Sequence, residues 1–325
     1  MGADRQGGDT AAAATVPAGA GTGSDGTAAH EPLRLSFSRI DLYRQCPLRY
    51  RYRYIDGLPE QPSPALSFGS SIHAALERFW DRKLPDPPPV ETLLDALYAH
   101  WDTAGFAAVD RSEQARYYRH ARDVLVRHHE RFAETRLAPV AVEQWFEVPL
   151  PDAVTLVGSI DLVVPTAEGG IGIVDWKTNR AAKRRSDVAA SLQLAIYALA
   201  SRHLWGHEPD WVALDFVVPG VRVQVDREDI DLDRALRVVG ETAAAIRAGH
   251  FPATPSPLCR WCDFRGECPA WEGEGPDVAA TAVTELRTIR RRQARDAERA
   301  GRLTEIIGQR LGPDALDGLT GAPDA

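Results

Sequence analysis

Two short apolar runs in the middle of the chain each carry a single aspartate. Residues 156–164 read Leu-Val-Gly-Ser-Ile-Asp-Leu-Val-Val, and residues 171–179 read Ile-Gly-Ile-Val-Asp-Trp-Lys-Thr-Asn. Both runs are rich in β-branched residues and a glycine pair separates them, so we expect two antiparallel strands. Because strand side chains alternate, Asp175 and Lys177 share a face, and antiparallel pairing can bring Asp161 beside Asp175. A lone carboxylate is costly to bury, so the pattern calls for partners.

Two carboxylates beside one amine suit the hydrolysis of a phosphodiester bond. Carboxylates bind Mg²⁺ or Mn²⁺, the ion polarises the phosphate and activates a water molecule, and the lysine helps to orient or deprotonate that water. The chain has only three lysines against 35 arginines. Because lysine is so rare here, its presence at position 177 is weak evidence that an amine is required there, since a compact amine differs chemically from a guanidinium. The alternative that the residues leave open is a structural Asp–Lys ion pair.

The surrounding segments alternate between helical and extended patterns. Ser36 or Ser38 can cap a first helix. Apolar spacing predicts further helices over residues 67–84, 90–137, 191–204, 231–249 and 278–311, and strands over residues 143–151, 211–218 and 221–225. The expected fold class is therefore α/β, with a mixed central sheet flanked by helices.

Composition divides the chain into three parts. The first 30 residues contain almost no large apolar side chain, so we expect residues 1–33 to form a disordered tail. We expect one folded domain over residues 34–272 and a charged helical extension over residues 273–325. Nothing in the sequence resembles a signal peptide or a membrane span, so we expect a cytoplasmic protein without a membrane partner.

The net charge of −8 argues against a passive nucleic-acid coat protein but not against an enzyme with a local basic groove. The best local candidate for contacting phosphates directly follows the second aspartate-bearing strand and comprises Arg180, Lys183, Arg184 and Arg185. For Arg184 and Arg185, a solvated loop is an equal alternative.

All four cysteines fall into a pattern typical of a metal site. Cys259, Cys262 and Cys268 lie within ten residues, whereas Cys46 precedes the two aspartate-bearing strands. In a cysteine-poor chain from a reducing compartment, thiols are more often ligands than disulfides. Spacing alone leaves zinc and an iron–sulfur cluster open. Either centre would close a loop around the whole expected domain.

Four motifs occur in an order that resembles the RecB-type branch of the PD-(D/E)XK nucleases, and the similarity runs from about residue 36 to residue 271. The motifs are His73 within Phe-Gly-Ser-Ser-Ile-His-Ala-Ala-Leu-Glu, then Gly-Ser-Ile-Asp161, then Asp175-Trp-Lys177, then Gln193-Leu-Ala-Ile-Tyr197. The resemblance implies a restriction-endonuclease-like core with Lys177 as the catalytic lysine. It also implies a Mg²⁺ or Mn²⁺ site built from His73, Asp161, Asp175 and the main-chain carbonyl of Trp176.

Two further assignments come from the same resemblance. Glu143 is an additional candidate metal ligand, although Glu147 fits the same loose description. Gln193 and Tyr197 lie four residues apart and so share a helix face, where relatives use the pair to contact DNA or to brace the lysine. The residues alone also allow Tyr197 to be a core side chain with Gln193 at its polar border.

The cysteine arrangement resembles AddB-type helicase–nuclease subunits and CRISPR-adaptation nucleases. It implies a C-terminal cysteine-rich segment and a 4Fe-4S cluster on Cys46, Cys259, Cys262 and Cys268, with zinc as the alternative. The expected function is a metal-dependent DNA exonuclease of repair or recombination that acts on single strands or free ends. No phosphate-binding loop of the helicase type is present, so unwinding would need a helicase partner. The alternatives are a CRISPR-adaptation-type nuclease and a non-catalytic iron–sulfur subunit that binds DNA.

Overall fold

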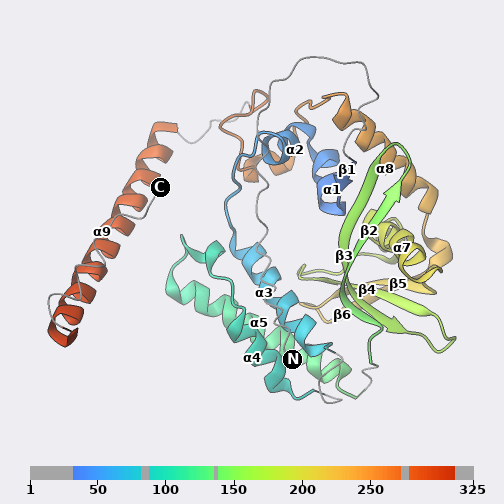
Figure 1. The fold of residues 1–325 in the computed structure, drawn as a ribbon, viewed down its shortest axis with the longest axis horizontal. Coiled ribbons are helices and arrows are strands. Elements are labelled where there is room, and N and C mark those ends of the chain that lie inside the picture. Colours follow the sequence, from blue (N-terminus) through green and yellow to red (C-terminus); the bar gives the residue numbers. More distant parts are fainter. Residues whose placement is uncertain (1–31, 82–87, 135–137, 272–277, 312–325) are drawn as a thin grey trace, which may run out of the picture.

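The computed structural model describes residues 32–81, 88–134, 138–271 and 278–311. A mixed sheet forms the centre of the fold (Figure 1). Its strands follow the order β1-β3-β4-β5-β6, and β2 pairs with β3 as well. The strands are β1 (Leu33–Leu35), β2 (Ala141–Leu150), β3 (Val154–Pro165), β4 (Ile171–Lys177), β5 (Trp211–Phe216) and β6 (Val221–Asp226).

The long strand β3 is paired almost throughout on one edge and is interrupted on the other. On the first edge, β2 pairs antiparallel with residues 154–163 of β3, except at Asp161. On the other edge, β1 pairs in parallel with residues 154–156 and β4 pairs antiparallel with residues 162–165. Among the described strands, none pairs with residues 157–161 on this edge, so the sheet is split beside Asp161.

Helices cover both faces of the sheet, as expected for an α/β fold (Figure 1). One apolar cluster joins the sheet to α1, α7 and α8, and a second joins it to α3, α4 and α5. The α-helices are α1 (Phe37–Gln45), α2 (Pro47–Tyr54), α3 (Pro64–Phe79), α4 (Val90–Ala99), α5 (Arg111–Phe132), α6 (Arg185–Ala189), α7 (Leu192–Trp205), α8 (Leu232–Arg247) and α9 (Val278–Leu311). The split in the sheet lies between the layer of α3 and the layer of α7.

The single helix expected over residues 90–137 is instead two helices, α4 and α5, with a short 3-10 turn between them. Gly105 in that turn packs so closely on the start of α3 that a Cβ atom would lie 2.1 Å from the Ser63 carbonyl oxygen. The carboxylate of Asp110 then accepts hydrogen bonds from the backbone N–H groups of Ser112 and Glu113, which begins α5 anew. Residues 135–137 lie outside the described part of the chain.

Other expected bounds differ less. Helix α3 begins three residues before position 67 and ends at Phe79, and residues 82–84 of the expected helix lie outside the described residues. Of the expected N-terminal tail, residues 1–31 are not described, while Leu33 already belongs to β1. Ser36 caps α1, as one of the two expected options. Among the described helices, none has the length and apolar character needed to cross a membrane.

Candidate active site

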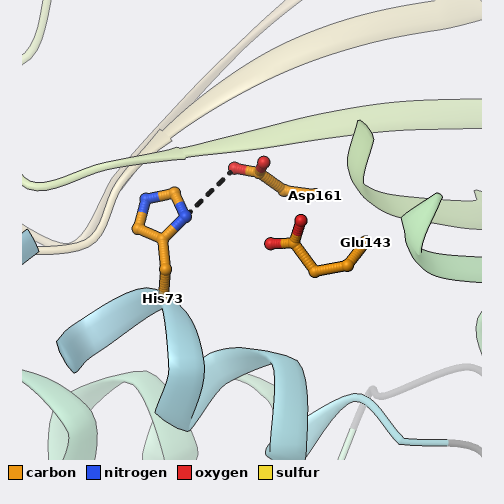
Figure 2. Close-up of side chains that lie close together, drawn as sticks. All are labelled: His73, Glu143 and Asp161. Atoms are coloured by element: carbon orange, nitrogen blue, oxygen red, sulfur yellow. Dashed lines mark ion pairs between the residues drawn. The ribbon is translucent and has the colours of Figure 1, made fainter. Parts of the chain in front are cut away.

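Three side chains from separate elements converge at the split in the sheet. His73 comes from α3, Glu143 from β2 and Asp161 from β3, and one ligand atom of each lies within 4.8 Å of the other two (Figure 2). The Nδ1 atom of His73 lies 3.6 Å from Oδ2 of Asp161. An imidazole and two carboxylates at this spacing form a donor set that fits a divalent cation.

Glu143 reaches this group through an unusual backbone conformation. The β2–β3 register continues on both sides of it and would place it opposite Asp161, but the two residues do not pair. Glu143 has a φ of 46°, which is rare for a residue with a side chain and is often found at functional sites. The hydroxyl of Ser159 donates to Oε2 of Glu143 at 2.8 Å. Glu147, the other sequence candidate, is instead bound by Arg34.

The backbone of Trp176 lies between two members of the group. Its N–H donates to Oδ2 of Asp161 at 2.8 Å, and its carbonyl oxygen lies 3.0 Å from Nε2 of His73. A carbonyl can only accept, so Nε2 carries the proton in this contact and Nδ1 keeps its lone pair for a cation on the side of Asp161. The Trp176 carbonyl expected as a ligand is thus adjacent to the group.

Beside this group, Asp175 lies in a hydrogen-bonded network with Lys177, Gln193 and Tyr197. Its carboxylate lies 2.5 Å from Nζ of Lys177 and accepts hydrogen bonds from Gln193 Nε2 at 2.7 Å and from the Tyr197 hydroxyl at 3.1 Å. Lys177 also donates to Oε1 of Gln193 at 2.8 Å. Gln193 and Tyr197 share a face of α7, as expected, and in this structure they fix Asp175 and Lys177.

Burial sets the electrostatics of the site. Burial raises the pKa of Asp161 well above its usual value, and the nearby charges of Asp175 and Glu143 add to this increase. Burial likewise raises the pKa of Glu143 and lowers the pKa of His73. Each shift disfavours the charged form of its side chain. A bound cation would offset the repulsion among the carboxylates, so this donor set gains more from a cation than exposed acids would.

Comparison with known proteins agrees with this arrangement. A family model described as the PD-(D/E)XK nuclease superfamily matches residues 34–269, which is more than half of the chain. The chain belongs to this superfamily. The match confirms the superfamily that the motif order indicated, and it indicates a metal-dependent nuclease, whereas the RecB-type branch stays a prediction.

The PD-(D/E)XK chain is also similar to a protein of Mycobacterium phage D29, the Gene 69 protein. The two are 25% identical over 274 residues, which cover 74% of this chain and 98% of the phage protein. The crystal structure of SSO0001 aligns with a TM-score of 0.37 and 14% sequence identity, covering 76% of this chain and 91% of that one.

The basic segment of this PD-(D/E)XK domain follows β4 directly. Arg180, Lys183 and Arg184 are exposed in and beside the loop that leads to α6. Arg185 forms two ion pairs, with Asp226 at 3.2 Å and with Asp229 at 2.7 Å. Arg184 has a longer contact, 3.9 Å from Asp187. The charge of Arg185 is already paired, which makes it the weakest phosphate-binding candidate of the four.

The four cysteines of the PD-(D/E)XK domain line one cavity, although more than two hundred residues separate Cys46 from Cys259. Cys46 lies at the junction of α1 and α2. The Leu48 N–H donates to the Pro252 carbonyl at 3.1 Å, and the Tyr52 hydroxyl donates to the Glu267 carbonyl at 2.7 Å. These bonds tie the two cysteine-bearing segments together. All four thiols are unpaired, and none of them forms a disulfide.

Sequence reasoning missed Ser159, which positions Glu143, and helix α2, which carries Tyr52. Ser159 precedes Asp161 by two residues in an expected strand, so alternation could have placed it near the site. The short helix α2 begins with Pro47 directly after Cys46, and proline at the first helical position is a recognised start signal.

Proposed function

We propose that this chain is a DNA exonuclease that cleaves phosphodiester bonds in single strands or at free ends, in DNA repair or recombination. One observation supports the proposal most strongly. The group of His73, Glu143 and Asp161 adjoins a lysine that Asp175 and Gln193 hold within 2.5 Å and 2.8 Å. A group that can bind a cation, beside an oriented amine, suits metal-dependent phosphodiester hydrolysis.

Each residue of the site has a separate task in this proposal. His73, Glu143 and Asp161 would hold a Mg²⁺ or Mn²⁺ ion, which would supply Lewis acidity to the reaction. Asp175 and the main-chain carbonyl of Trp176 are further candidate ligands. Lys177 would orient the attacking water or help to deprotonate it. Asp175 and Gln193 fix the Lys177 amine, so that little reorganisation is needed during the reaction. Tyr197 keeps its proton, because burial raises its pKa well above the usual value, and so remains a donor to Asp175.

We further propose that Cys46, Cys259, Cys262 and Cys268 bind a 4Fe-4S cluster, with zinc as the alternative. The shared cavity supports a common centre. Zinc with four thiolates at about 2.3 Å would hold the sulfur atoms roughly 4 Å apart. Among the described residues, no three cysteine sulfurs lie within 4.8 Å of one another. A cluster accepts wider spacing, since each thiolate binds a different iron atom.

A gel assay tests the proposed activity. Linear single-stranded DNA, linear duplex and circular single-stranded DNA, each labelled, are incubated with Mn²⁺, Mg²⁺ or EDTA. We expect shortening of the linear substrates with metal, no reaction in EDTA, and survival of the circle. Cleavage of the circle, which has no free end, would show that the protein is an endonuclease. No metal-dependent cleavage of any substrate would favour the non-catalytic subunit.

A further inference from the structure

Trp145 lies on the same face of the sheet as the group of His73, Glu143 and Asp161, which we call the cation-binding group. The β2–β3 register places Trp145 opposite Ser159, and residues opposite each other in a ladder share a face. The Ser159 hydroxyl donates to Glu143, so Trp145, Ser159 and Glu143 all lie on this face. Trp145 is 53% exposed, whereas its neighbour Phe146, which points to the other face, is 2% exposed.

The exposed indole is held in a defined orientation. Its Nε1–H donates to Oε1 of Glu147 at 3.2 Å. The Glu147 carboxylate is in turn bound by both terminal nitrogens of Arg34, at 2.6 Å and 2.9 Å. These contacts anchor one edge of the ring and leave the side chain accessible. A restrained aromatic ring loses little conformational freedom when a flat ligand stacks on it.

We propose that Trp145 stacks on a nucleobase of single-stranded DNA beside the phosphodiester that is cleaved. This inference rests on the proposed nuclease function. Trp145 follows Glu143 by two strand positions, which is about 6.6 Å along the strand. When the scissile phosphate lies at the cation-binding group, an adjacent base is within reach of the indole. Bases in a duplex are already paired and stacked, so Trp145 favours single strands.

The site's chemistry favours a base over other groups. Every base has an aromatic face, so stacking on tryptophan tolerates any sequence, as a general exonuclease requires. Loss of one such contact typically weakens binding by roughly fivefold to 150-fold. The acidic Glu147 beside the indole is neutralised by Arg34, so it does not repel the DNA backbone strongly.

The test combines variants of Trp145 with DNA that lacks single bases. Trp145→Ala removes the ring and Trp145→Phe keeps an aromatic face. Tyr98→Ala is the control, because Tyr98 is another exposed aromatic side chain, 79% exposed, and lies on α4. Labelled single strands with one abasic position, moved stepwise along the DNA, are cleaved under kcat/KM conditions.

We expect Trp145→Ala to lower kcat/KM on intact single strands by roughly fivefold to 150-fold, and Trp145→Phe to retain most of it. Tyr98→Ala should match wild type. One abasic position should impair wild type by a similar factor and have little further effect on Trp145→Ala. The inference would be overturned if Trp145→Ala had wild-type activity or if its sensitivity to every abasic position equalled that of wild type. A contact with another protein would then be the remaining role for Trp145.

Binding separates this inference from the proposed function. Fluorescence anisotropy with labelled oligothymidine, measured with Ca²⁺ in place of Mg²⁺, reports affinity without cleavage. If wild type cleaves no DNA but Trp145→Ala binds the single strand less tightly, the proposed function fails and the stacking site stands. If wild type cleaves DNA, but wild type and Trp145→Ala bind the single strand equally and are equally sensitive to every abasic position, the stacking site is wrong and the proposed function stands.

Discussion

The carboxylate of Asp161 occupies the place of a missing main-chain pairing, since its Oδ2 accepts a hydrogen bond from the Trp176 N–H at 2.8 Å. The β3–β4 ladder ends at the pair of Leu162 and Val174. One further step would pair Asp161 with Asp175, but the strands separate there. The side chain of Asp161 thus replaces a backbone acceptor at the split in the sheet, which fixes it beside His73.

The first prediction concerns the cost of ionising Asp161. Its folded-state pKa is raised, first by burial, above the value of about 3.9 for an unfolded chain. Its contribution to stability is therefore present below pH 4 and is lost as the pH rises through the raised value. We expect metal-free Asp161→Asn to be more stable than metal-free wild type at pH 8, with a smaller difference at pH 5.

Thermal unfolding with and without Mn²⁺ measures this effect. Each kcal/mol corresponds to roughly 2–4 °C in a domain of this size. Mn²⁺ should raise the melting temperature of wild type and change Asp161→Asn much less, because the cation loses a charged ligand. If the difference in melting temperature between the two proteins stayed constant from pH 5 to pH 8, ionisation of Asp161 would have no cost in stability.

A second prediction separates chemistry from positioning at Lys177. Lys177→Ala or Asp175→Ala should lower kcat by roughly 10²–10⁴-fold, the usual contribution of a positioned proton-transfer group. Gln193→Ala should have a smaller effect, because Asp175 still holds the amine at 2.5 Å. Circular dichroism confirms that each variant is folded. Near-normal metal-dependent cleavage by Lys177→Ala, purified free of wild type, would remove this residue from the proposed mechanism.

The sequence was sufficient to predict that β3 and β4 pair antiparallel and that Asp175 lies beside Lys177, because a turn and strand alternation determine these two relationships. It was not sufficient to choose between Glu143 and Glu147, which lie on the same face of one strand. The choice depends on the left-handed backbone of Glu143 and on the ion pair between Glu147 and Arg34. Neither feature has a local sequence signal, since one depends on strain and the other on a partner 113 residues away.

The expected single helix from residue 90 to residue 137 was wrong for a similar reason. Its apolar spacing is nearly continuous, but α4 ends at Ala99, Gly105 packs against the start of α3, and the Asp110 cap begins α5. Local pattern predicts which segments are helical better than it predicts where a neighbouring element interrupts them.

The third prediction concerns the path of the DNA. Replacing Arg180, Lys183 and Arg184 with alanine should weaken binding to single strands and flatten its dependence on salt by up to about two units of the log–log slope. Replacing Arg119, Arg122 and Arg237, which are also exposed, removes the same charge from other surfaces. That control should keep the wild-type slope. Equal slopes in wild type and the first variant would place the phosphate contacts elsewhere.

The last prediction concerns the four cysteines. Protein purified without oxygen should be brown and contain iron and sulfide, and Cys46→Ser or Cys262→Ser should lose both. A shared centre closes a loop of more than two hundred residues, which by the chain-entropy estimate for covalent crosslinks stabilises the fold by about 5 kcal/mol. We therefore expect the melting temperature of either variant to fall by on the order of 10 °C.

Tyr52→Phe is the matched control for this crosslink between the two cysteine-bearing segments. It removes the hydrogen bond from Tyr52 to the Glu267 carbonyl but leaves every thiol in place, so iron and sulfide should remain and the loss of stability should be small. Colourless anaerobic protein with stoichiometric zinc would show that the shared centre binds zinc and not a cluster, and the crosslink between the two segments would stand. Protein without metal, in which Cys46→Ser melts with wild type, would remove both, and the shared cavity would then be a packing feature of the two segments.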